Sequence, residues 1–462
     1  MLKEDSIKVQ NSYANIVKLA LPIAVSILIP QISMLTNTYF LGNYTPTLGL
    51  YQKQDLLSAS GIAGIFYLTL VMVGYGLVSG LLMLMSRKAG ENDKVGLGKL
   101  MSNGIILCFS LAILTSISTY YLAPLLFDLS IHEESIRISA IQFIHIRTWG
   151  LPFIILAQLG NTFFLATSNS KYIIAGSAVQ TLFNIIFDYL LIFGNLGFTE
   201  MGLAGSALAS VIADIGFMAS VWLIIKFKDY LKIYSIHIRK NWNWSLSKQI
   251  LYKSLPLIIQ YFLSIGAWEL FFIFVEHLGK AESALSQILR SVFGIVGVAT
   301  WALGSTCNSM VSNVIGQQKM NEVIPLIQRV VIVSFFVSLS IGLPLLLFPN
   351  YFLNLLTNDA SLVEMGTSSL RIVVVATWML SVASIYFNGV VGTGNTSVNM
   401  IFEFVAIVLY CIYITIVIEY LQLPLPFAWA SEFVYWLSLF VMSAYYLHKG
   451  NWKKYNSSIV TS

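Results

Sequence analysis

Six acidic side chains lie inside long apolar stretches of the chain, and their chemistry needs explanation first. They are Asp188, Asp214, Glu269, Glu276, Glu403 and Glu432. A charged side chain at the centre of a membrane costs about 3 kcal/mol on insertion scales, which makes such a residue a candidate for function. A carboxyl group there can bind and release a proton or a small cation. The alternative is a packing role, in which each carboxyl stays protonated or accepts hydrogen bonds where helices meet.

The spacing of these acids along the sequence indicates which of them are the stronger functional candidates. Asp188 follows Asn184 by four residues, so both side chains lie on one face of a helix, and Asp188 is the strongest candidate. Glu269 and Glu276 are seven residues apart and also share a face, with Glu269 deeper in its stretch and Glu276 close to its end. We therefore expect Glu269 to be a second coupling carboxylate. Spacing does not separate a cavity role from a packing role for Glu403 and Glu432.

The sequence lacks the residue patterns that enzymatic catalysis, nucleotide binding or a metal cluster would require. The five histidines lie in loops or near helix ends, and the sequence contains no HExxH, no GxSxG and no phosphate-binding glycine loop. The three cysteines are far apart inside apolar runs, which favours a packing role over a metal cluster or a disulfide. We therefore predict neither an enzyme nor a bound cofactor, and we expect H⁺ or Na⁺ as the coupling ion.

The composition places these acids in a membrane protein. Of the 462 residues, 57% are hydrophobic and 10% are charged, where soluble domains average about 25% charged. The stretch between Lys18 and Lys53 contains 34 residues without Asp, Glu, Lys or Arg, and a spanning helix needs about 20. A soluble enzyme and a secreted disulfide scaffold are excluded. Twelve helices are predicted, at residues 13–41, 58–86, 99–127, 138–167, 172–194, 200–226, 250–278, 284–316, 322–348, 366–392, 397–419 and 426–448.

The basic residues predict the orientation of these helices. Twenty Lys and Arg fall in the two tails and the even-numbered loops, and six fall in or beside the odd-numbered loops. This bias predicts a multi-pass protein of a bacterial-type plasma (inner) membrane with both termini in the cytoplasm. It also explains the net charge of +5 without a nucleic-acid partner.

The two halves of the chain resemble each other. KLALPI from Lys18 parallels KSLPLI from Lys253, and TWGLP from Thr148 parallels TWMLS from Thr377. The repeat predicts an all-α membrane protein with two pseudo-symmetric six-helix lobes and the substrate path between them. The predicted divisions are an N-lobe at 1–226, a basic cytoplasmic linker at 227–249, a C-lobe at 250–448 and a cytoplasmic tail at 449–462.

Three motifs resemble the multidrug and toxic compound extrusion (MATE) family. They are LALPI in the first helix, SRKAGEN in the second loop, and FNIIFDYLLIFGNLGFTEMGLAGSALAS across the fifth and sixth helices. The resemblance covers nearly the whole chain. It implies a V-shaped pair of six-helix lobes that export amphipathic, often cationic, compounds in exchange for Na⁺ or H⁺. Such a protein acts on small molecules among membrane lipids, and we expect a monomer without an obligate protein partner.

The resemblance also points to site residues. It matches Asn184, Asp188, Ser210 and Asn161 to cavity positions of the family. Asn37 stands where many members have Asp, so the usual carboxylate pair is replaced by an acid and an amide. Asn161 is displaced from Asp188 by roughly 13 Å along the membrane normal unless a helix bends. Asp214, one turn beyond Ser210, extends the polar track.

The sequence does not decide whether a Na⁺ ion would bind at Asp188 or at Glu269. The sodium site of some family members needs an acid in the tenth helix, where this chain has Asn388.

Two alternative functions remain. A flippase for lipids or lipid-linked saccharides in the same superfamily would share the two lobes, but such proteins often line the cavity with cations. Here the helices offer little beyond Arg147 and Arg290, which favours cationic or neutral substrates. An intramembrane enzyme is the weaker alternative, because no suitable histidine set is present.

The basic-residue bias yields a direct prediction. A reporter fused after Asn451 and one inserted in the loop between Lys226 and Lys253 should both report a cytoplasmic location, because loops rich in Lys and Arg stay on that side. A periplasmic signal from either fusion would contradict the predicted orientation.

Overall fold

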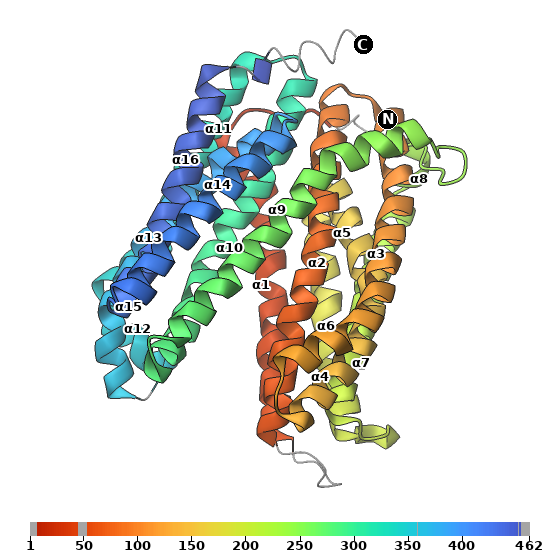
Figure 1. The fold of residues 1–462 in the computed structure, drawn as a ribbon. Helices are drawn as coiled ribbons and strands as arrows, with labels where there is room; N and C mark the ends of the chain where they lie inside the picture. Colours follow the sequence, from red (N-terminus) through yellow and green to blue (C-terminus); the bar gives the residue numbers. More distant parts are fainter. Residues whose placement is uncertain (1–6, 45–52, 358, 451, 454–462) are drawn as a thin grey trace. The chain divides into compact units, whose positions relative to one another are not determined.

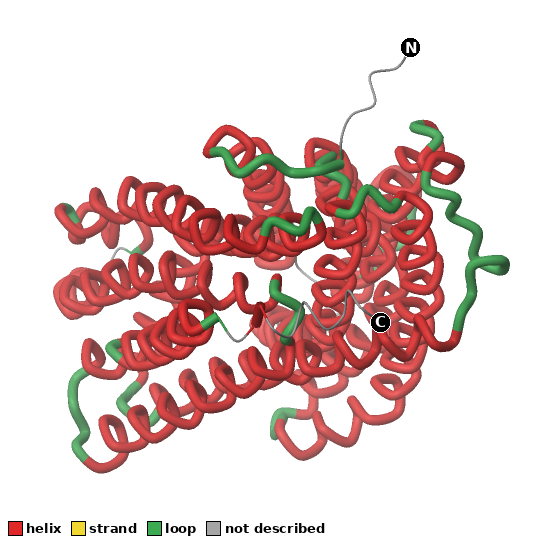
Figure 2. The backbone as a smooth tube through the Cα atoms, turned by 90° about the horizontal axis from the view of Figure 1, so that it is seen from above, coloured by secondary structure: helices red, strands yellow, loops and turns green. Residues whose placement is uncertain are grey.

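The computed structural model describes residues 7–44, 53–357, 359–450 and 452–453, and helices dominate these ranges (Figure 2). Twelve helical stretches in them are long and apolar enough to span a membrane, and the described residues contain no strand. This agrees with the predicted all-α fold. Of the predicted tail, residue 451 and residues 454–462 lie outside the described ranges.

The helices follow one another with short connections. Their bounds are α1 (Tyr13–Asn43), α2 (Lys53–Gly90), α3 (Lys94–Ser130), α4 (Glu134–Arg147), α5 (Leu151–Ala166), α6 (Ile173–Phe193), α7 (Gly202–Phe227), α8 (Tyr230–Ile233), α9 (Trp244–Glu276), α10 (Lys280–Gly316), α11 (Val323–Leu347), α12 (Pro349–Leu356), α13 (Ala360–Gly392), α14 (Thr396–Ile414), α15 (Leu425–Trp429) and α16 (Ser431–Lys449).

Several helices begin four to six residues earlier than hydropathy predicts. α3 begins at Lys94 rather than residue 99, and α13 begins at Ala360 rather than residue 366. Charged residues near these two starts, Lys94 and Lys99 in α3 and Glu364 in α13, interrupt the apolar pattern, but a capping side chain holds the first turn of each helix. Asp93 accepts a hydrogen bond from the backbone N–H of Gly96 (2.7 Å), and Asp359 accepts one from Ser361 (2.9 Å).

The fourth predicted helix is interrupted. α4 and α5 are joined by one turn of 3-10 helix at Thr148–Gly150, which ends two residues before Pro152. Proline has no backbone N–H to continue the preceding hydrogen-bond ladder, which favours a local change of helix type. The short helix α12 and the π-helical turn at Thr415–Tyr420 were also not predicted.

The chain folds into two compact units. One contains Val25–Leu81 and Asp93–Tyr252, and the other contains Met1–Ala24, Leu82–Asn92 and Lys253–Ser462. In the latter, aliphatic side chains form most of the buried core and pack around a few aromatic ones, with the rings of Phe271 and Trp429 5.0 Å apart.

The segment before α1 belongs to the second of these units and is bound to α10. Asn313 donates to the carbonyl of Ile7 and accepts from the N–H of Val9, both at 3.0 Å, and Gln317 donates to the carbonyl of Val9 at 2.9 Å. Ile7 and Val9 are buried. The backbone groups of this segment are therefore hydrogen-bonded to α10, and its apolar side chains are buried.

The predicted linker at 227–249 is bound to α3 mainly through the buried side chain of Asn103, and Asn241 also donates to the hydroxyl of Ser102 at 3.2 Å. Asn103 donates to the carbonyls of Lys99 and Asn241 (2.8 Å each). Its Oδ1 accepts from the N–H of Asn243 (3.0 Å) and the hydroxyl of Ser247 (2.9 Å). α8 lies within this linker and α9 begins there.

Asn103→Ala should destabilise the protein by about 2 kcal/mol, because it leaves backbone and hydroxyl groups of residues 241–247 without their partner. Thermal unfolding of the purified protein and protease cleavage of residues 234–243 measure the effect. Asn43→Ala is the matched control, since exposed Asn43 bonds, within the described ranges, only to the carbonyl of Tyr39 in its own helix. Equal unfolding temperatures and cleavage rates for the two variants would contradict this role of Asn103.

Candidate functional site

Two neighbouring helices, α6 and α7, carry polar side chains at every fourth residue. The helices lie side by side (Figure 1) and are joined by a short connection at residues 194–201. Small residues permit the close approach, since a Cβ atom at Gly205 would lie 2.5 Å from the carbonyl oxygen of Leu191. Residues four apart share a helix face, so the polar side chains form two facing rows. We call these rows the polar ladder: Gln180, Asn184 and Asp188 on α6, and Ser206, Ser210 and Asp214 on α7.

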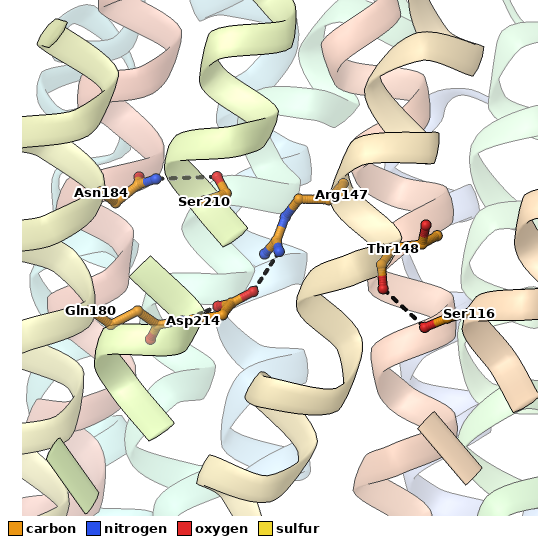
Figure 3. Close-up of polar contacts among 7 residues, drawn as sticks. All are labelled: Ser116, Arg147, Thr148, Gln180, Asn184, Ser210 and Asp214. Carbon is orange, nitrogen blue, oxygen red and sulfur yellow. Dashed lines mark hydrogen bonds and ion pairs between the residues drawn. The ribbon is translucent and has the colours of Figure 1, made fainter. Parts of the chain in front are cut away.

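Hydrogen bonds join the two rows. Asn184 donates to the hydroxyl of Ser210 (3.1 Å), and Gln180 donates to Oδ1 of Asp214 (2.9 Å), as Figure 3 shows. The third pair is bridged from α1, because Asn37 donates both to Ser206 (2.6 Å) and to the carboxylate of Asp188 (3.3 and 3.4 Å).

A neighbouring residue of α1 and the loop after it also hold the ladder. The hydroxyl of Ser33 donates to Oδ1 of Asn184. Just beyond α1, Tyr44 donates to Glu200, ahead of α7, at 2.7 Å. Burial and this hydrogen bond raise the pKa of Tyr44 to about 12, so its phenol remains a donor at neutral pH. These contacts fix the end of α1 against the start of α7.

The negative charge of Asp214, at one end of the ladder, is balanced by an arginine. Nη1 of Arg147 lies 2.5 Å from Oδ2 of Asp214, and the side chains are 12% and 1% exposed (Figure 3). The guanidinium carbon lies 3.9 Å from the ring centre of Tyr67. Gly150 leaves room for this pair, because a Cβ atom there would lie 2.7 Å from Oδ2 of Asp214. The interruption between α4 and α5 thus brings a cation to the ladder.

Asp188 at the other end is buried without an ion pair to any described residue. Its hydrogen-bond donor is the neutral amide of Asn37, and Arg147 acts on it through space rather than through a bond. An anion held by neutral donors keeps a full negative charge that can attract a proton, a metal ion or an organic cation. The nearby oxygens of Asn184, Ser206 and Ser210 are of the kind that Na⁺ binds.

The structure places Asn37, Asn184, Asp188, Ser210 and Asp214 along the polar ladder, where the hydrogen bonds form three groups: Asn37 with Asp188, Asn184 with Ser210, and Gln180 with Asp214. Asn161 lies outside the ladder: its Nδ2 donates to Gln158 in the same helix at 3.4 Å, and its Oδ1 is buried without a partner among the described residues.

The second-half candidates are dispersed by comparison. Glu269 forms an ion pair with Arg290 (3.2 Å), and Glu276 is exposed at the end of α9. Asn388 donates to the carbonyl of Ser384 in its own helix (2.9 Å), and Glu432 accepts from Trp436 (2.8 Å). Glu403 alone is bound by two other helices, through Ser264 and Tyr435.

Sequence reasoning missed Gln180, Ser206 and the pairing of Arg147. The four-residue spacing of Gln180, Asn184 and Asp188 was a readable signal. The position of Arg147 depends on the interrupted helix, and nothing in the hydropathy pattern predicts its partner.

Comparison with known proteins decides the family. The MatE family model matches residues 22–190 and 256–417, which is most of the chain and includes both halves. The chain belongs to the MatE family. MatE proteins are membrane transporters rather than enzymes, are ion-coupled and need no cofactor. The twelve apolar helices agree with a multi-pass membrane protein.

Curated relatives of this MatE protein include a Thermotoga maritima protein named "Probable multidrug resistance protein NorM". It is 22% identical over 449 residues, covering 95% of this chain and 93% of the relative. A Synechocystis protein of the same name is 25% identical and covers 73% of this chain and 72% of the relative. A Photorhabdus laumondii protein named "Multidrug resistance protein MdtK" is 22% identical over 58% of each chain.

Solved structures share the fold. A MOP superfamily transporter from Pyrococcus furiosus, described as having a binding pocket of reverse polarity, matches with a TM-score of 0.86 at 16% identity over 100% of both chains. An outward-facing multidrug resistance MATE family transporter matches equally well, with a TM-score of 0.86 at 16% identity over 99% of both chains.

The buried ion pair of this MatE protein yields a stability prediction. Arg147→Gln should cost about 3 kcal/mol or more, because it leaves Asp214 buried without its counter-charge, and Asp214→Asn in the same chain should restore part of the loss. Thermal unfolding in detergent measures both changes.

The matched control is Arg137→Gln, whose partner Asp128 is 56% exposed, so its loss should change stability by under about 1 kcal/mol. If Arg147→Gln and Arg137→Gln unfold at the same temperature, the Arg147–Asp214 pair does not stabilise the fold.

Proposed function

We propose that this MatE protein is a secondary active multidrug efflux transporter, which exports amphipathic cations in exchange for H⁺ or Na⁺. The observation that carries the proposal is Asp188, a buried carboxylate bound by a neutral amide and not by a cation. The names of the NorM and MdtK relatives support drug export. Transport would proceed by alternating access between the lobes at 1–226 and 250–448, in a plasma membrane with both termini cytoplasmic and with a single chain as the working unit.

Competition for one negative charge provides the coupling. With the site open to the outside, Asp188 takes up a proton or Na⁺ and no longer attracts a cationic substrate, which leaves. The neutral site then reorients, releases the ion inside and binds the next substrate. The coupling ion must bind the two orientations with different affinity, since an ion with equal affinity for both shifts nothing.

The two ends of the ladder differ in charge. Arg147 occupies the carboxylate of Asp214, so that end of the ladder offers no unpaired acid to a second cation. A coupling ion that enters the ladder is therefore held at Asp188. This arrangement also favours cationic substrates over the anionic head groups of a lipid flippase, because Arg147 and Arg290 are each already paired with an acid.

Asp188→Asn should abolish coupled efflux, whereas Asn37→Ala should only weaken it, because Asn37 positions the carboxylate but carries no exchangeable charge. Dye efflux from proteoliposomes, under H⁺ and Na⁺ gradients imposed separately, tests the difference and identifies the ion. Asp128→Asn is the control, since Asp128 is an exposed acid. Full and equal loss of efflux in the Asp188 and Asn37 variants would contradict this division of roles.

Substrate binding should depend on pH with a defined sign. Protonation removes the negative charge of Asp188, so affinity for a fluorescent cation should fall as pH decreases or as Na⁺ increases. In Asp188→Asn the dependence should be flat, because the amide does not titrate in this range. If wild type and Asp188→Asn have the same slope in equilibrium titrations, the coupling carboxylate is another residue.

A further inference from the structure

Glu403 on α14 is a buried carboxyl group at the meeting point of three helices of the second half. The residue is 1% exposed. The hydroxyls of Ser264 on α9 and Tyr435 on α16 both donate to its Oε1, the latter at 2.5 Å. These three helices are the seventh, eleventh and twelfth spans of the chain. Asp188 occupies the corresponding place in the first half, where the ladder involves the first, fifth and sixth spans.

The two oxygens of Glu403 are in different surroundings. Oε1 has two donors, whereas Oε2 is buried and has no partner among the described residues. One turn earlier on the same helix, Oδ1 of Asn399 is also buried without a partner in the described part of the chain, while its Nδ2 donates to Gln260 at 2.7 Å. An ionised carboxylate leaves Oε2 as an unsatisfied acceptor. A protonated one has an O–H to donate, and Asn399 supplies an acceptor on the same helix face.

The surrounding charges do not neutralise Glu403. On α9 the groups that face it are Ser264 and Gln260, which are uncharged, and Glu269 farther along is paired with Arg290. On α16 the titratable neighbours are Tyr435 and Glu432, and on α14 the neighbour is Tyr410. On α13, Glu364 and Arg371 are exposed and Tyr386 packs on Phe440.

Glu432 is a weaker candidate for proton exchange. Its described hydrogen bond comes from Trp436 in its own helix, so it is not tied to movement between helices.

We propose that Glu403 is a second proton-binding site, so that each six-helix half carries one exchangeable proton. Uptake places a proton from solvent on Oε2, which then donates to Oδ1 of Asn399, and release returns the same proton to solvent and leaves the anion bound to Ser264 and Tyr435. Because the three helices each contribute one group, separation of α9 or α16 from α14 changes the proton affinity. The link to transport rests on the proposed function, but proton binding at Glu403 does not.

Infrared difference spectroscopy of the purified protein between low and high pH tests the site, since protonated carboxyl groups have a distinct C=O stretching band. Glu403→Gln should lose one component of this band, while Asp188→Asn and the exposed-acid control Glu276→Gln should keep it. Tyr435→Phe should retain the component and move its disappearance to higher pH by about one unit, because the anion loses a donor.

The Tyr435→Phe shift keeps the test valid if Glu403→Gln does not fold. A Glu403→Gln spectrum identical to wild type at every pH, or a component that does not move in Tyr435→Phe, would overturn the proposal. If the component shifts when Na⁺ is added at constant pH, the ion bound at Glu403 is a metal ion, and the proton-binding proposal is wrong. Failure of Asp188→Asn to alter transport would refute the proposed coupling site and leave the Glu403 spectrum unaffected.

Discussion

The pairing of buried charges is the constraint on which the described first-half site depends. A lone charge among apolar helices is costly, so each buried acid must have a counter-charge, several donors or a proton. Asp214 has a counter-charge in Arg147 and a further donor in Gln180. Asp188, two turns along the facing row, has only a neutral amide among the described residues. The same α6–α7 packing therefore carries one acid in an ion pair and one that is bound by a neutral amide, which is the difference on which the proposed coupling rests.

Backbone geometry makes this difference possible. Arg147 reaches Asp214 because the chain changes to a turn of 3-10 helix at Thr148–Gly150, and because Gly150 has no side chain to occupy the space of the carboxylate. Gly205 allows α7 to approach the backbone of α6, which brings Ser210 within hydrogen-bond distance of Asn184. A larger residue at either glycine would separate polar groups whose hydrogen bonds depend on distances of about 3 Å.

The sequence was sufficient for local features and insufficient for pairings across the fold. Hydropathy predicted the spanning helices because each apolar stretch is long enough to cross a bilayer, but it missed first turns held by Asp93 and Asp359, which depend on capping. The helical period placed Asn184 and Asp188 on one face, and the resemblance to the family added Ser210. Neither predicted that Arg147 neutralises Asp214 or that Glu269 is paired with Arg290, because these contacts join helices whose relative rotation is not encoded in spacing.

The two halves hold their acids in the same two ways but use different residues to do so. In each half one acid is paired with arginine: Asp214 with Arg147, and Glu269 with Arg290. In each half another buried acid is bound by neutral groups: Asp188 by Asn37, and Glu403 by Ser264 and Tyr435. Amide donors and hydroxyl donors hold a carboxylate without cancelling its charge, so both acids can gain a positive ion without first breaking an ion pair. An arginine at either place would remove that capacity, because a paired carboxylate holds its proton far less readily. In the proposed ion exchange, the neutral partners of Asp188 and Glu403 are therefore as important as the acids themselves.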